Sequence, residues 1–186
     1  MTMPIAAPRF TVDQVRGFPE DGQRYELLDG LLLVTPSPRF LHQVVSMHLA
    51  NQLYNALSPA GLATVVLSGD VEIGESTLLI PDILVLPPGY GPDTPWKLIH
   101  EWWLAVEVLS PSSRVYDREF KRPAYQAIGV EDVWIVDPEA RTVEVWERGA
   151  AAPRVERERI EWRGVAVDLG VVFGLNSGRQ EIQDRR

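Results

Sequence analysis

The sequence predicts an α/β (α+β) fold in which helices flank a central mixed β-sheet. Apolar runs with strand character are separated by two segments of helical period, residues 41–57 and 114–129. The order is a hairpin, a helix, three strands, a helix and two or more further strands, which is typical of a sheet covered by helices. At 186 residues the chain has the length of one domain with a single sizeable core. We therefore expect a lead-in over residues 1–20 and one domain over residues 21–186.

The boundaries of these elements follow from turn and helix signals. Asp29-Gly30 between two apolar runs predicts a tight β-hairpin near the N-terminus. The first helix follows the proline-containing loop "TPSPRF" and ends at "SPAG", and Gly129 ends the second helix. A turn around Asp137 separates two later strands. We predict the remaining strands at residues 63–73, 78–86 and 101–110 in the centre, with weaker ones near 155–160 and 165–167.

Composition excludes several classes of protein. The chain has no cysteine, which excludes disulfides and thiolate metal sites. No apolar segment approaches roughly 18 uninterrupted residues, and the first residues do not resemble a signal peptide, so we expect a cytoplasmic protein without a membrane partner. The net charge of −8 argues against a protein that coats nucleic acid, because such proteins present basic surfaces. An acidic enzyme can still act on a polyanion if its site is locally basic or recruits cations.

Two predicted strands each carry one carboxylate inside an apolar run. Asp82 lies in "LLIPDILVL", directly after a proline, and Glu107 lies in "WLAVEVLS". Glutamate is rarely fully buried unless it is paired or binds a metal. One interpretation places Asp82 at a strand end and Glu107 on the solvent face of an edge strand. The sharper hypothesis is a buried pair that holds a hard divalent cation such as Mg²⁺.

A lysine follows these carboxylates on the next predicted helix. We expect Asp117 to be the N-cap of this helix, with Lys121 one turn further on and Tyr125 on the same helix face. An ordinary exposed helix lysine is the alternative for Lys121. Its position directly after the Glu107 strand favours a functional role. Pro123 would cost an interior helix one hydrogen bond, so we expect either a later helix start or a kink.

Several segments in combination resemble a known family. They are "RYELLDG", "PSPRFLHQ", "PDILVL", "AVEVLSPSSR", "IGVEDVWIVDP" and "RTVEVW", which together span about Tyr25 to Trp146. The pattern of Pro81-Asp82, Glu107 and the following lysine resembles the PD-(D/E)XK nuclease superfamily. More closely, it is similar to the Uma-type branch of restriction-endonuclease-like proteins.

This resemblance implies a restriction-endonuclease-like core with Asp82 and Glu107 as metal-binding carboxylates. The superfamily lysine normally stands two residues after the acidic residue, where this chain has Leu109. In the Uma-type branch it is displaced to the following helix, which matches Lys121. Glu26 in the hairpin resembles an additional acidic residue of the branch. His42 lies in the family-like segment "PSPRFLHQ" and is a candidate for the edge of the site.

The function implied is an endonuclease that depends on Mg²⁺, or on Mn²⁺, and hydrolyses phosphodiester bonds of DNA. Two alternatives stay open, namely a non-catalytic interaction module on the same fold and a nuclease that acts on RNA. Carboxylates that converge on a cleft would support the enzyme, whereas buried and salt-bridged carboxylates would support the module. We also expect a homodimer, since proteins of this type carry edge strands and apolar faces suited to pairing.

Overall fold

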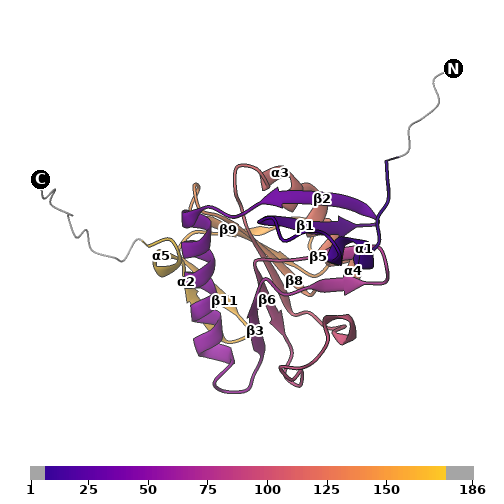
Figure 1. The fold of residues 1–186 in the computed structure, drawn as a ribbon. Coiled ribbons are helices and arrows are strands. Elements are labelled where there is room, and N and C mark those ends of the chain that lie inside the picture. Colours follow the sequence, from indigo (N-terminus) through magenta and orange to yellow (C-terminus); the bar gives the residue numbers. More distant parts are fainter. Residues whose placement is uncertain (1–6, 175–186) are drawn as a thin grey trace, which may run out of the picture.

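The computed structural model describes residues 7–174 and contains a central six-stranded sheet with helices packed on its faces (Figure 1). The helical segments are α1 (Val12–Arg16), α2 (Phe40–Leu57), the 3₁₀ turn η1 (Trp96–Leu98), α3 (Arg114–Tyr116), the π-helical turn η2 (Asp117–Lys121), α4 (Arg122–Ile128) and α5 (Leu169–Val172). The strands are β1 (Gln23–Leu28), β2 (Leu31–Pro36), β3 (Thr64–Leu67), β4 (Val71–Ile73), β5 (Thr77–Leu79), β6 (Ile83–Leu86), β7 (Leu104–Val108), β8 (Asp132–Asp137), β9 (Thr142–Glu147), β10 (Arg154–Glu156), β11 (Arg159–Trp162) and β12 (Val165–Asp168).

The central sheet has the strand order β10-β9-β8-β7-β6-β3 and is mixed, because β7 and β8 run parallel while the other pairs are antiparallel. A second sheet has the order β2-β1-β5-β4, and β11 pairs with β12 in a separate hairpin. The predicted fold class is confirmed, including the N-terminal hairpin, which turns at Asp29-Gly30 with positive φ at both residues. Such angles are those of the two-residue turns that suit the twist of a hairpin.

The two long strands predicted over residues 63–73 and 78–86 are wrong in one respect, since each divides into two. β3 and β6 pair with each other in the central sheet, whereas β4 and β5 pair with each other in the second sheet. The chain passes between the sheets at Ser68, which has a left-handed φ of 52°, and at Pro81, which has no N–H to donate to a ladder. Asp82 follows this bend directly and is held there by main-chain hydrogen bonds to Val106 and Ser68.

The tail also differs from the prediction. The strand expected near 155–160 is divided into β10, which joins the central sheet, and β11, which pairs with β12. Positive φ at Arg163 and Gly164 forms the turn between β11 and β12. Alternating apolar and charged residues therefore predicted strand character correctly but not the break between the two strands.

The side chains of the central sheet alternate between two apolar clusters. Ile83 and Val85 pack on one face, which α2 covers, while Leu84 and Leu86 pack on the other, near Tyr125 of α4. Burying each such aliphatic side chain contributes roughly 1.5–3 kcal/mol. The sheet between these clusters is therefore a rigid support for any side chain at the ends of its central strands.

Residues 114–128 form one continuous helical segment that contains a π-helical turn, η2. The N–H of Arg122 donates to the carbonyl of Asp117 across this turn, and Pro123, which has no N–H to donate, follows the turn directly. Gly129, with φ of 101°, ends the segment. The expected N-cap at Asp117 is wrong, because the chain is already helical from Arg114 and Asp117 is buried.

Candidate active site

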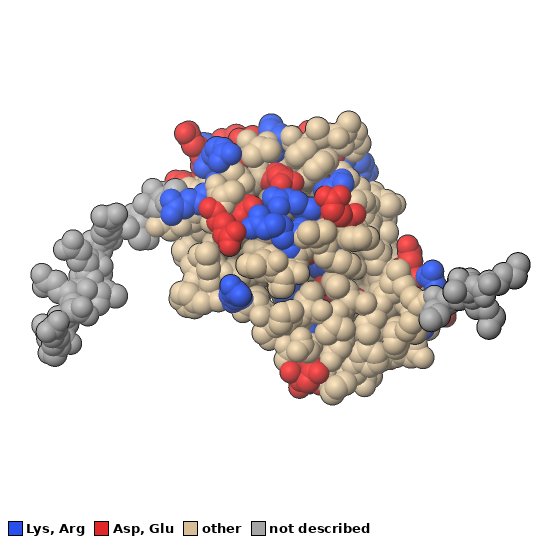
Figure 2. Space-filling view, turned by 90° about the horizontal axis from the view of Figure 1, so that it is seen from above, with Lys and Arg blue, Asp and Glu red and all other residues tan. Residues whose placement is uncertain are grey.

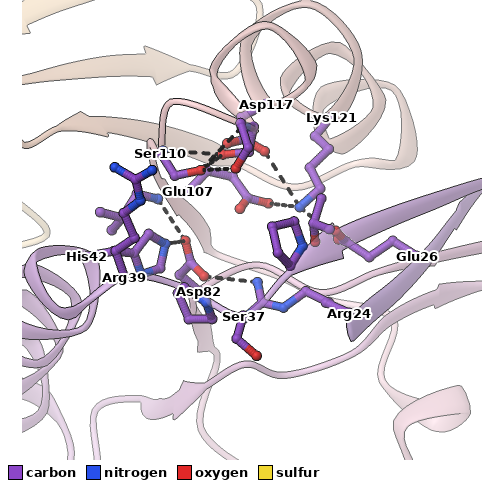
Figure 3. Close-up of a pocket in the computed structure, with 16 residues that line it drawn as sticks. Arg24, Glu26, Ser37, Arg39, His42, Asp82, Glu107, Ser110, Asp117 and Lys121 are labelled. Carbon is purple, nitrogen blue, oxygen red and sulfur yellow. Dashed lines mark hydrogen bonds and ion pairs between the residues drawn. The ribbon is translucent and has the colours of Figure 1, made fainter. Parts of the chain in front are cut away.

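Polar side chains from both sheets and two helical segments meet at a cavity of about 340 Å³ (Figure 3). They come from β1, the loop between β2 and α2, the first turn of α2, the bend before β6, the end of β7 with its following loop, and η2. The charged or ring-bearing polar residues that line it are Arg24, Glu26, Arg39, His42, Asp82, Glu107, Asp117 and Lys121. The four residues predicted for the site, Glu26, Asp82, Glu107 and Lys121, therefore lie at one cavity, together with His42, the candidate for its edge.

Asp82 is 5% exposed and both of its carboxylate oxygens accept hydrogen bonds. Oδ1 accepts from Arg24 at 3.0 Å, and Oδ2 accepts from the main-chain N–H of Val108 at 2.8 Å. Oδ2 also lies 3.0 Å from Nε2 of His42. Burial alone would raise the pKa of Asp82, but the interactions with His42, Arg24 and Val108 outweigh burial and lower it to about 2. Asp82 is therefore a carboxylate at neutral pH.

Glu107 is 2% exposed and lies on β7, an interior strand between β6 and β8. The edge-strand interpretation of this residue is therefore wrong. Its Oε1 accepts hydrogen bonds from Lys121 at 3.0 Å and from the hydroxyl of Tyr125 at 2.6 Å. Burial raises the pKa of Glu107 well above its ordinary value, and the charges of Asp117 and Asp82 add to the effect against the opposing charge of Lys121.

Lys121 lies within a group of three carboxyl groups. Its Nζ is 2.7 Å from Glu26, 3.0 Å from Glu107 and 3.8 Å from Asp117, and it is 2% exposed. Burial would lower the pKa of Lys121, but these neighbouring charges outweigh burial and raise it, so the ammonium keeps its proton. The interpretation of Lys121 as an exposed helix lysine is wrong. So is a solvent-facing Glu26, which is 1% exposed and accepts from the N–H of Ile80 at 2.8 Å.

The single ammonium of Lys121 does not neutralise three carboxylates. Besides burial, the excess of acidic groups also raises the pKa of Asp117. Burial raises the pKa of Asp117 to about 6, with Lys121 and a hydrogen bond from Ser113 opposing the rise. The charges of Asp82 and Glu26 raise it further. This side of the cavity thus holds more negative charge than its own cation offsets, and an additional cation would be stabilised there.

The donor set fits a hard divalent cation. Within residues 7–174 no group of three or more His, Cys, Asp or Glu side chains is arranged to hold a metal ion. Mg²⁺, however, is usually bound by one or two carboxylates and keeps several waters. Asp82 and Glu107 are two such carboxylates at one cavity. Oδ1 of Asp82 accepts one hydrogen bond, from Arg24, whereas Oδ2 contacts both Val108 and His42, so an ion at Oδ1 would lie next to the Arg24 guanidinium.

The arrangement combines the two outcomes that the sequence distinguished. The carboxylates line a cavity, as an enzyme requires, and each is also ion-paired, as an interaction module would allow.

Sequence reasoning missed Arg24 and the buried role of Asp117. Arg24 is two residues before Glu26 on one strand, so strand parity places both side chains on the same sheet face and could have indicated it. Asp117 lies four residues before Lys121, the spacing of neighbours on a helix face.

The fold is that of a restriction-endonuclease-like protein. The chain belongs to the Uma2 family, whose description is "Putative restriction endonuclease" and whose model matches residues 12–176. Its fold is similar to that of "a putative nuclease belonging to DUF820 from Anabaena variabilis ATCC 29413", a crystal structure. The TM-score is 0.67 at 17% identity, over 88% of this chain and 97% of that chain. A comparison with curated proteins gave no significant match.

Proposed function

We propose that this protein is a nuclease that hydrolyses phosphodiester bonds of DNA with Mg²⁺, or with Mn²⁺ in its place. The family and the nuclease-like fold support the general class. The observation that carries the finer proposal is the position of Lys121, a buried ammonium 3.0 Å from Glu107 at the cavity that Asp82 also lines. Two buried carboxylates at one cavity with a lysine beside them serve both to hold a cation and to place positive charge next to a reacting phosphate.

The proposed chemistry assigns a role to each buried side chain. Asp82 and Glu107 would hold the divalent ion, which when bound polarises a phosphoryl oxygen and makes a nearby water more acidic. Lys121, a compact point charge, would orient the attacking water or stabilise the negative charge that develops on the phosphate. Glu26 and Asp117 hold the ammonium in place, and the hydroxyl of Tyr125 orients Glu107.

Arg24 and His42 would act indirectly, through their contacts with Asp82. These contacts keep that carboxylate ionised and fix its orientation. Since an ion at Asp82 needs at least one of its oxygens, we propose that Arg24, which is partly exposed, turns from Asp82 toward the substrate phosphate when the ion binds.

An interaction module is the second candidate, and a specific observation favours it. Arg114 pairs with Asp137 and Glu139, and Arg118 pairs with Glu144 at 2.8 Å, so the basic residues of the helical segment are largely neutralised. In Figure 2, blue and red side chains lie next to one another on this view of the surface, without a broad basic patch. Such a surface attracts a phosphate backbone only weakly.

Nicking of supercoiled plasmid separates these functions. Wild type with Mg²⁺ or Mn²⁺ should convert the plasmid to the open circle, and Asp82→Asn and Glu107→Gln should each abolish the conversion. A labelled RNA in the same buffer tests the RNA alternative. Absence of cleavage of either nucleic acid under both metals would favour the interaction module.

Two further expectations stay predictions, namely a homodimer and a cytoplasmic location. Among the described residues, no helix has the length and apolar character needed to span a membrane. Size-exclusion chromatography with light scattering would test the homodimer.

A further inference from the structure

Three cationic side chains line the cavity, and they differ in what they contact. Lys121 is paired with Glu26 and Glu107, and Arg24 is paired with Asp82. Arg39 also lines the cavity, yet within residues 7–174 its guanidinium has no hydrogen bond and no ion pair. An arginine that faces an acid-lined cavity without neutralising any of the acids is not required by the fold.

The backbone that carries Arg39 is fixed although its side chain is exposed. The residue lies between Pro38 and the start of α2, and its carbonyl accepts the hydrogen bond from the N–H of Gln43 at 3.1 Å. The hydroxyl of Ser37 donates to the carbonyl of Gly22 at 2.6 Å, which ties this loop to the start of β1. The guanidinium is therefore held at the cavity by an ordered loop while its donors remain available.

Within residues 7–174, no neighbouring carboxylate forms an ion pair with Arg39. The two oxygens of Asp82, an acid of the same cavity, already accept from Arg24 and from the N–H of Val108, with His42 also in contact. Figure 3 shows Arg39 beside His42 and Asp82, on the side of the cavity away from Lys121 and Glu26. Positive charge thus lies on both sides of the Asp82–Glu107 pair. Lys121 and Arg24 are paired with carboxylates, whereas Arg39 has no such partner within residues 7–174.

We propose that Arg39 binds a phosphate of the nucleic-acid backbone next to the phosphate that is cleaved. The guanidinium is a planar fork whose donors match two oxygens of a phosphate, whereas a lysine offers only a point charge. This inference rests on the proposed function, because it assumes that a phosphodiester enters the cavity.

The test measures binding without cleavage. A fluorescently labelled short DNA duplex is titrated with protein in Ca²⁺, which takes the place of Mg²⁺ with less support for hydrolysis, at a series of salt concentrations. Wild type is compared with Arg39→Gln, Arg39→Lys and Arg141→Gln. Arg141 is a matched control, because it is an exposed arginine at the turn between β8 and β9, away from the cavity, and it also has no partner among the described residues.

A phosphate contact has a distinctive signature in this experiment. Arg39→Gln should weaken binding roughly tenfold and reduce the slope of log affinity against log salt by about 1. Arg39→Lys should keep the slope and lose part of the affinity, and Arg141→Gln should change neither. The thermal unfolding midpoint should be the same in all four proteins, because neither guanidinium has a hydrogen-bond or ion-pair partner within residues 7–174.

The outcomes separate this inference from the proposed hydrolysis. An Arg39→Gln protein with wild-type affinity and slope overturns the phosphate contact even if wild type nicks plasmid DNA. A slope that falls only in Arg39→Gln, in a protein that cleaves nothing with Mg²⁺ or Mn²⁺, supports the phosphate contact and overturns hydrolysis. Wild type that binds no DNA at any salt concentration overturns the inference as well.

Discussion

Asp82 and Glu107 are both buried at one cavity, 5% and 2% exposed, yet their surroundings shift their pKa values in opposite directions. The pKa of Asp82 is lowered to about 2, because the contacts from His42, Arg24 and Val108 outweigh its burial. The pKa of Glu107 is raised, because it is buried and shares a single ammonium with two other carboxyl groups. Burial alone therefore does not decide protonation here; the number of donors and cations for each carboxylate does.

The cavity therefore has two halves. In one, Asp82 is ionised beside Arg24 and His42; in the other, Glu107, Glu26 and Asp117 share the single ammonium of Lys121. The half around Asp82 is complete without further charge, whereas the half around Glu107 would be completed by a divalent cation.

Removal of Lys121 should have the largest effect. Lys121→Met leaves Glu26, Glu107 and Asp117 buried without their cation, and breaking a buried ion pair on one side costs about 3–5 kcal/mol. Urea denaturation should show this loss, and plasmid nicking should be abolished. Adding Glu107→Gln to the same protein should restore part of the stability, because one buried charge is removed. An unchanged free energy of unfolding in Lys121→Met would show that the cluster is not coupled as described.

The aspartates of the two halves should respond oppositely to neutralisation. The pKa of Asp82 is about 2 against a model-compound value of 3.8, so its ionised form stabilises the fold by roughly 2 kcal/mol at pH 7, and Asp82→Asn should lose about that amount. The pKa of Asp117 is about 6, so its charged form is disfavoured in the fold, and Asp117→Asn should be neutral or stabilising without metal. Destabilisation by both substitutions to the same extent would contradict the comparison.

The pH dependence of stability follows from the same two values. The contribution of Asp82 is fully present above about pH 4 and is lost as the pH falls toward 2. Between about pH 4 and pH 6 the folded state keeps the proton of Asp117 while the unfolded state has released it, so the contribution of this group falls as pH rises through 6. Unfolding free energies measured from pH 4 to 7 should show that decline in wild type and a smaller one in Asp117→Asn.

Tyr125→Phe should have the smallest effect. It removes only the hydroxyl that donates to Glu107 at 2.6 Å and keeps the buried ring. The loss should be about 1 kcal/mol, the usual net contribution of one hydrogen bond. If the hydroxyl also stabilises the ionised form of Glu107, the variant should need a higher pH for nicking than wild type does. A pH profile that coincides with that of wild type would assign the hydroxyl to stability alone.

Much of the fold was predictable from sequence because its signals are local. Asp29-Gly30 marked the hairpin, the apolar period of α2 marked its length, and Gly129 marked the end of the second helical segment. Ser68-Gly69-Asp70 and Pro81-Asp82 interrupt the apolar runs at the two bends, but the change of sheet was not predicted, because only the pairing partners of the strands show it. A proline followed by a buried acid is the one local feature that marks the second bend.

The site was predictable in part for a different reason. Glu107 attracts notice because a charge in an apolar run is rare, and Lys121 because of where its helix follows that strand. The dense contacts of the cavity depend on tertiary packing, since Arg24 and Asp82 are distant in sequence and Asp117 reaches the cavity only because the helical segment begins earlier than an N-cap there would imply. Residue type and spacing alone do not convey such proximity.

We propose that a divalent cation balances the negative charge around Glu107. Calorimetric titration of Mg²⁺ near pH 6, in two buffers of different ionisation enthalpy, tests it most directly. Wild type should show saturable binding with release of protons, Glu107→Gln and Asp82→Asn should lose that binding, and Arg141→Gln should keep it. Wild type that gives no binding heat, or binding that persists unchanged in both carboxylate variants, would contradict it.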